Sequence, residues 1–151
     1  MFNTILLENG LSPGDVRLLR HRDKEAEAEK GTPYKFWLTH PDSKFLRYQE
    51  HQGIHNRKRL DAKYWAAFVV TPDTKTKFAG LYRARYVRTL KDEEHQTCGV
   101  HHRLGRCDQY DLILDEKLKD YIGRLVIDWG PSPRSWIQRA DRQDKEIVGT
   151  D

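Results

Sequence analysis

The fold is decided by YWAAFVVTPDTKTKFAGLYRARY, residues 64–86. Residues 64–71 form an apolar, β-branched run, residues 72–74 are typical of a turn, and residues 77–87 return with partial alternation. Together these segments predict a β-hairpin. Gly80, in the middle of the return strand, indicates a β-bulge or a close approach by another backbone.

The return strand of this hairpin is expected to have two different faces, because successive side chains of a strand point in opposite directions. One face would carry small and aromatic residues, namely Phe78, Gly80, Tyr82, Ala84 and Tyr86. The other face would carry Ala79, Leu81, Arg83 and Arg85. We expect the side chains of the first face to pack in the core and those of the second face to bind a phosphate backbone.

Short helices and further strands are predicted on both sides of the hairpin. The expected helices are residues 3–9, capped by Asn3 or Thr4, then one from Thr32, one from Pro41, and residues 115–123, capped by Asp115. The expected strands are residues 16–20, 108–114, 125–129, 135–139 and 146–148. The sequence therefore predicts one α+β domain over residues 1–151, with a curved, barrel-like, mostly antiparallel sheet and flanking short helices.

The composition describes a folded, highly charged chain. Charged residues make up 33% and hydrophobic residues 37%, and 27 basic residues against 23 acidic ones give a net charge of +4. Four Trp, seven Tyr and five Phe argue against disorder. No run approaches the ~20 apolar residues that span a bilayer, and the first residues do not resemble a secretory signal. Two cysteines make no disulfide framework, so we expect a cytoplasmic protein without a membrane partner.

Basic side chains cluster in three parts of the sequence, and clustering is what a polyanion requires. The residues expected to contact a nucleic-acid backbone are Arg57, Lys58, Arg59, Lys63, Arg83, Arg85, Arg139 and Arg142. Four rings could stack on a base, each stack contributing about 1–3 kcal/mol. These are Tyr64, Trp65, Tyr82 and Trp136, and each could equally belong to the core.

A zinc site is a weaker possibility in residues 94–107. His95, Cys98, His101 and Cys107 are of the residue types that bind zinc, but their spacing matches no common zinc finger. One alternative function is therefore a zinc-stabilised RNA-binding or protein-interaction module. The other interpretation of this segment is a loop that happens to contain histidines and cysteines.

Catalysis is poorly supported by the sequence. Residues 73–75 and 115–117 both read Asp-x-Lys, the end of a motif of metal-dependent nucleases, so a small nuclease is a further alternative. Asp73 also suits a turn, and Asp115 suits a helix cap. Neither a complete catalytic motif nor a phosphate-binding glycine loop is present, so we expect no enzyme activity and no cofactor.

Six motifs spread over nearly the whole chain resemble one family. They are LENGLSPGDVRLLRH (7–21), YWAAFVVTP (64–72), FAGLY (78–82), YDL (110–112), GRLVIDWG (123–130) and WIQRADRQDK (136–145). Together they resemble the N-terminal specificity region of bacterial proteins whose C-terminal part is a GIY-YIG nuclease. Such regions resemble the PUA/SRA-like group of curved β-barrels, which recognise modified or flipped bases.

The resemblance implies a DNA-binding specificity domain of a modification-dependent restriction system. Its partners would be double-stranded DNA, with modified cytosine as a candidate base, and a nuclease domain or subunit that this chain lacks. A flipped base needs rings that stack on it and polar groups that bond its edge. Trp65, Tyr82 and Trp136 could supply the rings, and Gln138, Asp128 or Asp141 the polar groups.

Overall fold

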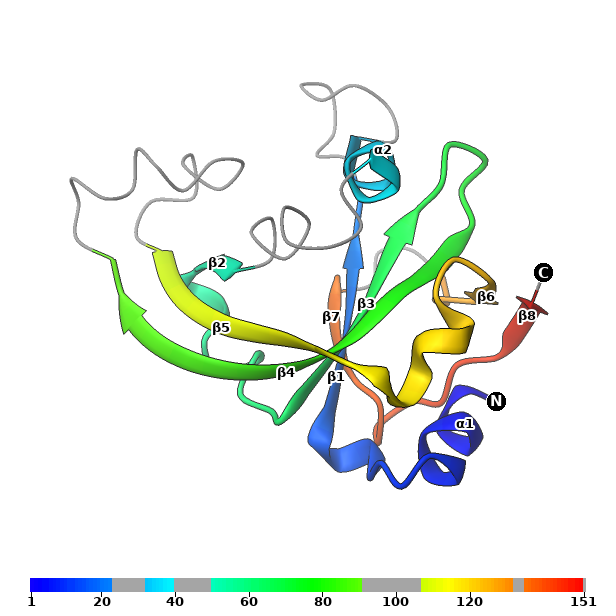
Figure 1. Cartoon of the computed structure of the whole chain (residues 1–151), viewed down its shortest axis with the longest axis horizontal. Coiled ribbons are helices and arrows are strands. Elements are labelled where there is room, and N and C mark those ends of the chain that lie inside the picture. The colour runs from blue at the N-terminus through cyan, green and yellow to red at the C-terminus, as the bar shows by residue number, and fades with distance from the viewer. Residues whose placement is uncertain (23–31, 40–49, 91–106, 132–134, 151) are drawn as a thin grey trace.

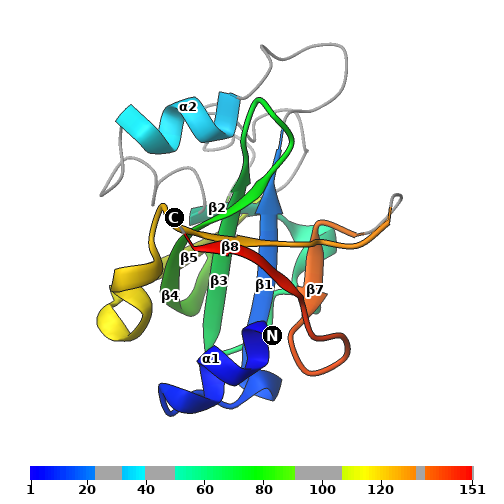
Figure 2. The same ribbon diagram turned by 90° about the vertical axis from the view of Figure 1, so that its right-hand side faces the viewer.

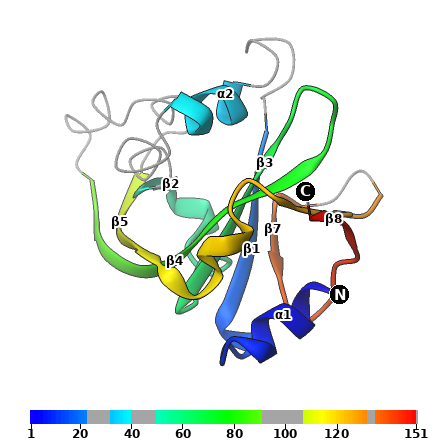
Figure 3. The same ribbon diagram turned by 45° about the vertical axis from the view of Figure 1, so that its right-hand side comes forward.

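The computed structural model describes residues 1–22, 32–39, 50–90, 107–131 and 135–150. It is an α+β structure in which eight strands form one curled sheet, an open half-barrel (Figure 3). The strands are β1 (Val16–His21), β2 (His51–Gly53), β3 (Tyr64–Val70), β4 (Thr76–Thr89), β5 (Cys107–Asp115), β6 (Leu125–Ile127), β7 (Ile137–Arg139) and β8 (Ile147–Thr150). The helices are α1 (Phe2–Glu8) and α2 (Thr32–Thr39), with 3-10 turns η1 (Pro13–Asp15), η2 (Ile54–Asn56) and η5 (Glu116–Tyr121).

The strand order along the sheet is β2-β5-β4-β3-β1-β7, and β6 joins β4 to β8. β1 and β3 are parallel, whereas the other six described pairs are antiparallel. The expectation of a barrel-like, mostly antiparallel sheet is confirmed, and the parallel pair was not predicted. Parallel neighbours need a long crossover, and residues 22–63 supply it. α2, within this crossover, lies over the end of the sheet toward which β1 points (Figure 2).

The predicted hairpin is confirmed as β3 and β4, with a turn in which Asp73 accepts a hydrogen bond from the Thr71 hydroxyl. The predicted bulge is confirmed as well, because Ala67 pairs with Gly80 but Phe68 pairs with Phe78, which leaves Ala79 unpaired. Gly80 has φ +151°, and a Cβ there would lie 3.0 Å from Leu114 Cδ1. Glycine is therefore required at this position.

The bulge changes which residues of β4 share a face. Phe78 lies with Leu81 in one core cluster, whereas Ala79 lies with Tyr82 in the other. The prediction that Phe78 and Tyr82 share a face is therefore wrong, since the extra residue shifts the alternation between them. Beyond the bulge the predicted alternation holds, and Arg83 and Arg85 lie on the face opposite Tyr82.

Both faces of the central strands are buried, which explains why β3 is apolar without alternation. Ala66 and Phe68 face the first cluster, which α1, η5 and β6 cover. Trp65, Ala67 and Val69 face the second cluster, beneath α2 and Leu60. Figure 1 shows the consequence, a central pair β1–β3 with the long curved ribbon β4–β5 on one side and α1 on the other.

Several element ends differ from the sequence prediction. α1 begins at Phe2, so its cap is Met1, and the predicted caps Asn3 and Thr4 lie inside the helix. The Asn3 side chain donates to the Ala140 carbonyl, 2.7 Å away. Asp115 caps η5 as predicted, accepting from the Lys117 amide, but η5 is a 3-10 turn. The helix expected from Pro41 lies outside the described residues. No helix among those described has the length and apolarity needed to cross a bilayer.

Candidate anion-binding site at the β1–β7 edge

One row of side chains crosses the sheet on the face of the second cluster. Arg17 on β1 pairs with Trp65 on β3 and with Arg139 on β7, and Trp65 pairs with Tyr82 on β4. Directly paired residues point to the same side of a sheet. The row is aromatic where the core covers it, and it becomes cationic at the β7 edge.

A cavity of about 830 Å³ opens at this cationic end of the row. It is lined by Arg17, Lys58, Arg59, Pro131, Ser135, Ile137, Gln138, Arg139, Arg142 and Gln143. Five of these ten residues are cations, and none is aromatic. We call this cavity the basic pocket. Its lining suits an anion far better than a planar base.

Two of the arginines in the basic pocket are held by neutral acceptors. Arg17 donates to the carbonyls of Arg59 (3.1 Å), Gly14 (3.3 Å) and Asp61 (3.1 Å). Arg59 donates to Asn56 Oδ1 (3.2 Å) and to the Ile137 carbonyl (3.4 Å). Such bonds fix the guanidinium groups without cancelling their charge. Burial is the main cause that lowers the pKa of Arg17 below its usual value, and repulsion from the charge of Arg139 is the second. A bound anion would offset this repulsion between the two guanidinium groups.

The other three cations of the pocket differ in how they are paired. Arg139 forms a two-bond ion pair with Asp141, at 3.0 Å and 2.8 Å, which lowers the pKa of the Asp141 carboxyl. Lys58 and Arg142 are exposed, and neither side chain has an ion pair within the described part of the chain. The pocket thus holds more positive charge than its neighbouring carboxylate balances.

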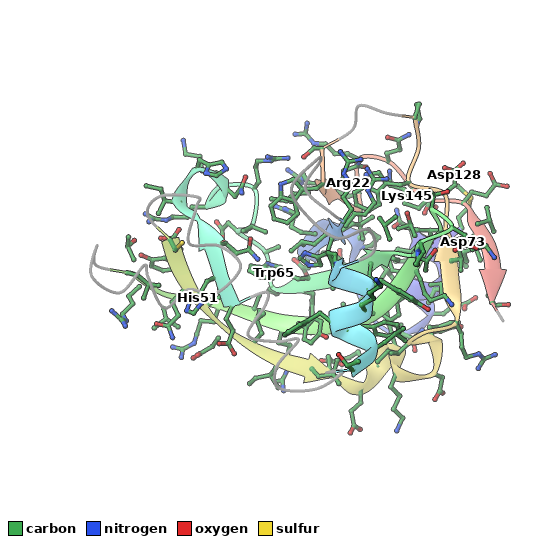
Figure 4. The ribbon with its side chains drawn as sticks, turned by 90° about the horizontal axis from the view of Figure 1, so that it is seen from above. Arg22, His51, Trp65, Asp73, Asp128 and Lys145 are labelled. Carbon is green, nitrogen blue, oxygen red and sulfur yellow. The ribbon has the colours of Figure 1, made fainter. Side chains whose placement is uncertain are left out.

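Gln138 is held in the wall of the pocket from behind. Its Nε2 donates to the Ser135 carbonyl at 3.2 Å, and its Oε1 accepts from Lys145 Nζ. Lys145 is only 2% exposed, and its ammonium also donates to the Trp129 carbonyl and lies 4.9 Å from the Trp129 ring centre. Figure 4 shows Lys145 on the same side of the molecule as Arg22 and Asp128, away from His51. The polar edge predicted for Gln138 is therefore partly used by internal bonds.

The remaining predicted backbone contacts lie away from the pocket. Arg83 and Arg85 project from the opposite face of the sheet, because Arg83 pairs with Tyr64, which packs against the first cluster. They face carboxylates of β5, with Arg85 joined to Asp111 and Arg83 Nε 3.7 Å from Asp115. The basic residues predicted to share one surface therefore occupy two.

Two further predicted cations have carboxylate partners of their own. Arg57 donates two bonds to Asp108, of 2.8 Å and 2.6 Å. Lys63 is exposed and lies 3.8 Å from Asp15. Neither belongs to the lining of the basic pocket.

The four predicted stacking rings are mostly packed inside the fold. Trp65 is 0% exposed and donates from Nε1 to the Leu60 carbonyl, while Tyr82 is 1% exposed. Neither ring offers a free face to a base in this structure. Tyr64 is half-buried against the first cluster and Trp136 against the second. Of the four, Trp136 lies nearest in sequence to the pocket, between the lining residues Ser135 and Ile137.

The other predicted polar residues can be placed only in part. Asp128 is exposed and accepts a hydrogen bond from the Gly130 amide, as a turn residue does. Cys107 is buried at the start of β5, and the other residues of the zinc hypothesis, His95, Cys98 and His101, lie outside the described residues. Within the described ranges, no three His, Cys, Asp or Glu residues come together as metal ligands.

The chain has no significant match to a protein-family model, a curated protein or a solved structure.

Of the residues that line the basic pocket, the sequence predicted Lys58, Arg59, Gln138, Arg139 and Arg142 as contacts, but Arg17 was missed. The available signal was a charged residue between Val16 and Leu18 in an apolar strand, which alternation places on the face opposite to theirs.

Proposed function

We propose that this chain is a DNA-binding domain that holds the phosphate backbone of a duplex at the basic pocket. The observation that carries the proposal is the convergence of five cations on one cavity from three separate parts of the chain. Arginine clusters bind phosphate well, because each guanidinium combines charge with a fork of donors. In the pocket two of these forks are already oriented by backbone carbonyls.

The lining of the pocket supports contact with the backbone instead of with a base. A base-binding pocket needs rings that stack, and none of the described lining residues is aromatic. Phosphate contacts fix the position of a protein on a duplex, while contacts with base edges carry the sequence information. The pocket would thus position the duplex, and any base would be read by a neighbouring surface.

The second part of the proposal is that this neighbouring surface reads a modified base, modified cytosine among the candidates. It rests on the motif resemblance, which also implies a nuclease domain or subunit as partner. Among the predicted rings, Trp136 suits this role best because it is partly exposed and lies next to two pocket residues. A cytoplasmic location is part of the proposal because the two cysteines make no disulfide framework.

Fluorescence anisotropy with labelled duplexes tests both parts. We expect binding whose affinity falls with salt, with a log–log slope of about 4 to 5 if each of the five cations neutralises one phosphate. Tighter binding to duplexes with methylated or hydroxymethylated cytosine than to plain duplexes supports the second part. Salt-insensitive failure to bind any duplex contradicts the proposal, and a preference for RNA of the same sequence contradicts its choice of nucleic acid.

The Asp141→Asn variant is expected to bind DNA about three- to tenfold more tightly than the wild type. Asp141 occupies the donor fork of Arg139, so a phosphate must displace or share that carboxylate. The control is Asp111→Asn, which frees Arg85 on the other face of the sheet and changes the net charge equally. Anisotropy at one salt concentration measures both variants, and equal gains in affinity would mean that only total charge matters.

A further inference from the structure

The segment of residues 54–61 connects the basic pocket to a second polar network, which is centred on a buried carboxylate. Lys58 and Arg59 line the pocket, whereas the residue before them, Arg57, turns toward β5. There Arg57 meets Asp108, whose side chain is 0% exposed. Lys58 and Arg59 therefore line the basic pocket, while the adjacent Arg57 is directed away from it toward Asp108.

The bonds of this network fix the direction of Arg57. Its Nε and Nη2 donate to the two carboxylate oxygens of Asp108 at 2.8 Å and 2.6 Å, and Nη2 also lies 2.7 Å from Thr89 Oγ1. Thr89 in turn donates to Asp108 at 2.8 Å, and the Tyr86 ring lies 5.0 Å from the guanidinium carbon. The hydrogen bond with Asp108 raises the pKa of Arg57 above its usual value. A side chain held in this way is a poor phosphate contact.

The other end of the segment is held by the central strands. Arg17 donates to the carbonyls of Arg59 and Asp61, and Trp65 Nε1 donates to the Leu60 carbonyl at 3.0 Å. Lys58 and Arg59 thus lie between two anchored points. Loss of either anchor frees the backbone that aims them into the pocket.

We propose that Arg57 and Asp108 are positioning residues, which hold residues 54–61 so that Lys58 and Arg59 face the ligand of the basic pocket. This inference rests on the proposed function for the identity of the ligand as duplex DNA. It assigns Arg57 a role different from that of its neighbours in the basic run. Arg57 acts through Lys58 and Arg59, without contact with a phosphate.

Whether Asp108→Asn weakens or strengthens DNA binding distinguishes the positioning role from an effect of charge alone. The substitution makes the protein more positive, so electrostatics alone would strengthen binding to a polyanion. We expect it to weaken binding about tenfold, because an amide cannot accept both bonds of the Arg57 fork and the segment loosens. The salt slope should also fall by about 1.8, the share of two phosphate contacts. Asp111→Asn, with the same change of charge, should change neither quantity appreciably.

Two further measurements keep the inference separate from stability and from the proposed function. Arg57→Lys keeps the charge but not the fork, so it should reproduce the loss, whereas a direct phosphate contact would be largely retained. Partial unfolding would weaken binding without changing the salt slope.

In the protein without DNA, NMR should show at least tenfold faster exchange of the Trp65 indole N–H in Asp108→Asn than in Asp111→Asn. If the wild type binds no duplex, the proposed function fails. If indole exchange is equal in the two variants, or if Asp108→Asn binds as tightly as Asp111→Asn, the positioning role is wrong.

Discussion

The double variant Lys58→Glu/Arg142→Glu is expected to bind duplex DNA about a hundredfold more weakly than the wild type, a loss of about 2.8 kcal/mol. Both side chains line the basic pocket, are exposed, and have no side-chain hydrogen bond or ion pair within the described part of the chain. The exchange should therefore remove two phosphate contacts and add repulsion while leaving the fold intact. Anisotropy titrations measure the affinity, and thermal unfolding monitored by circular dichroism checks the stability.

The matched control is Arg83→Glu/Arg85→Glu, on the opposite face of the sheet. Each double variant replaces two cations by two anions and so lowers the formal net charge from +4 to 0. If the pocket is the interface, the control should lose less than about threefold in affinity beyond any loss of folded protein. A larger loss in the control than in the pocket variant would move the interface to the β4–β5 ribbon.

Most of the fold could be predicted because local patterns determined it. The run from Tyr64 and the turn at Asp73 identified the hairpin, and Gly80 identified the bulge. The parallel pairing of β1 with β3 could not be predicted, since the register of strands far apart in sequence depends on the tertiary structure. The face of Phe78 was predicted wrongly because one extra residue reverses an alternation whose period is two.

The candidate site was less predictable, since it depends on strand pairing. Lys58 and Arg139 are far apart in the sequence, and they meet only because β7 pairs with β1 beside residues 54–61. Arg57, Lys58 and Arg59 look alike in the sequence, yet Arg57 forms an ion pair with the buried carboxylate of Asp108. Composition finds cations, but only the register across the sheet shows which of them share a face.

Trp65→Ala is expected to lower the free energy of unfolding by about 3–5 kcal/mol, the cost of emptying a large aromatic site in a core. The Trp65 ring is fully buried, lies 4.7 Å from the Tyr110 ring centre, and its Nε1 bonds the Leu60 carbonyl. Urea unfolding followed by circular dichroism measures the change. A loss below about 1 kcal/mol would contradict the assignment of this ring to the core.

Trp65→Phe is the control that separates packing from base stacking. It keeps most of the apolar volume and loses the indole donor, so it should cost only about 1–2 kcal/mol. Arg17 still anchors residues 59–61 in this variant, and DNA affinity should stay within about threefold of the wild type. If the Trp65→Phe protein is well folded but no longer distinguishes modified from plain duplexes, Trp65 takes part in reading the base. Its burial in the protein without DNA would then mean that the 54–61 segment moves when DNA binds, since that segment covers the ring.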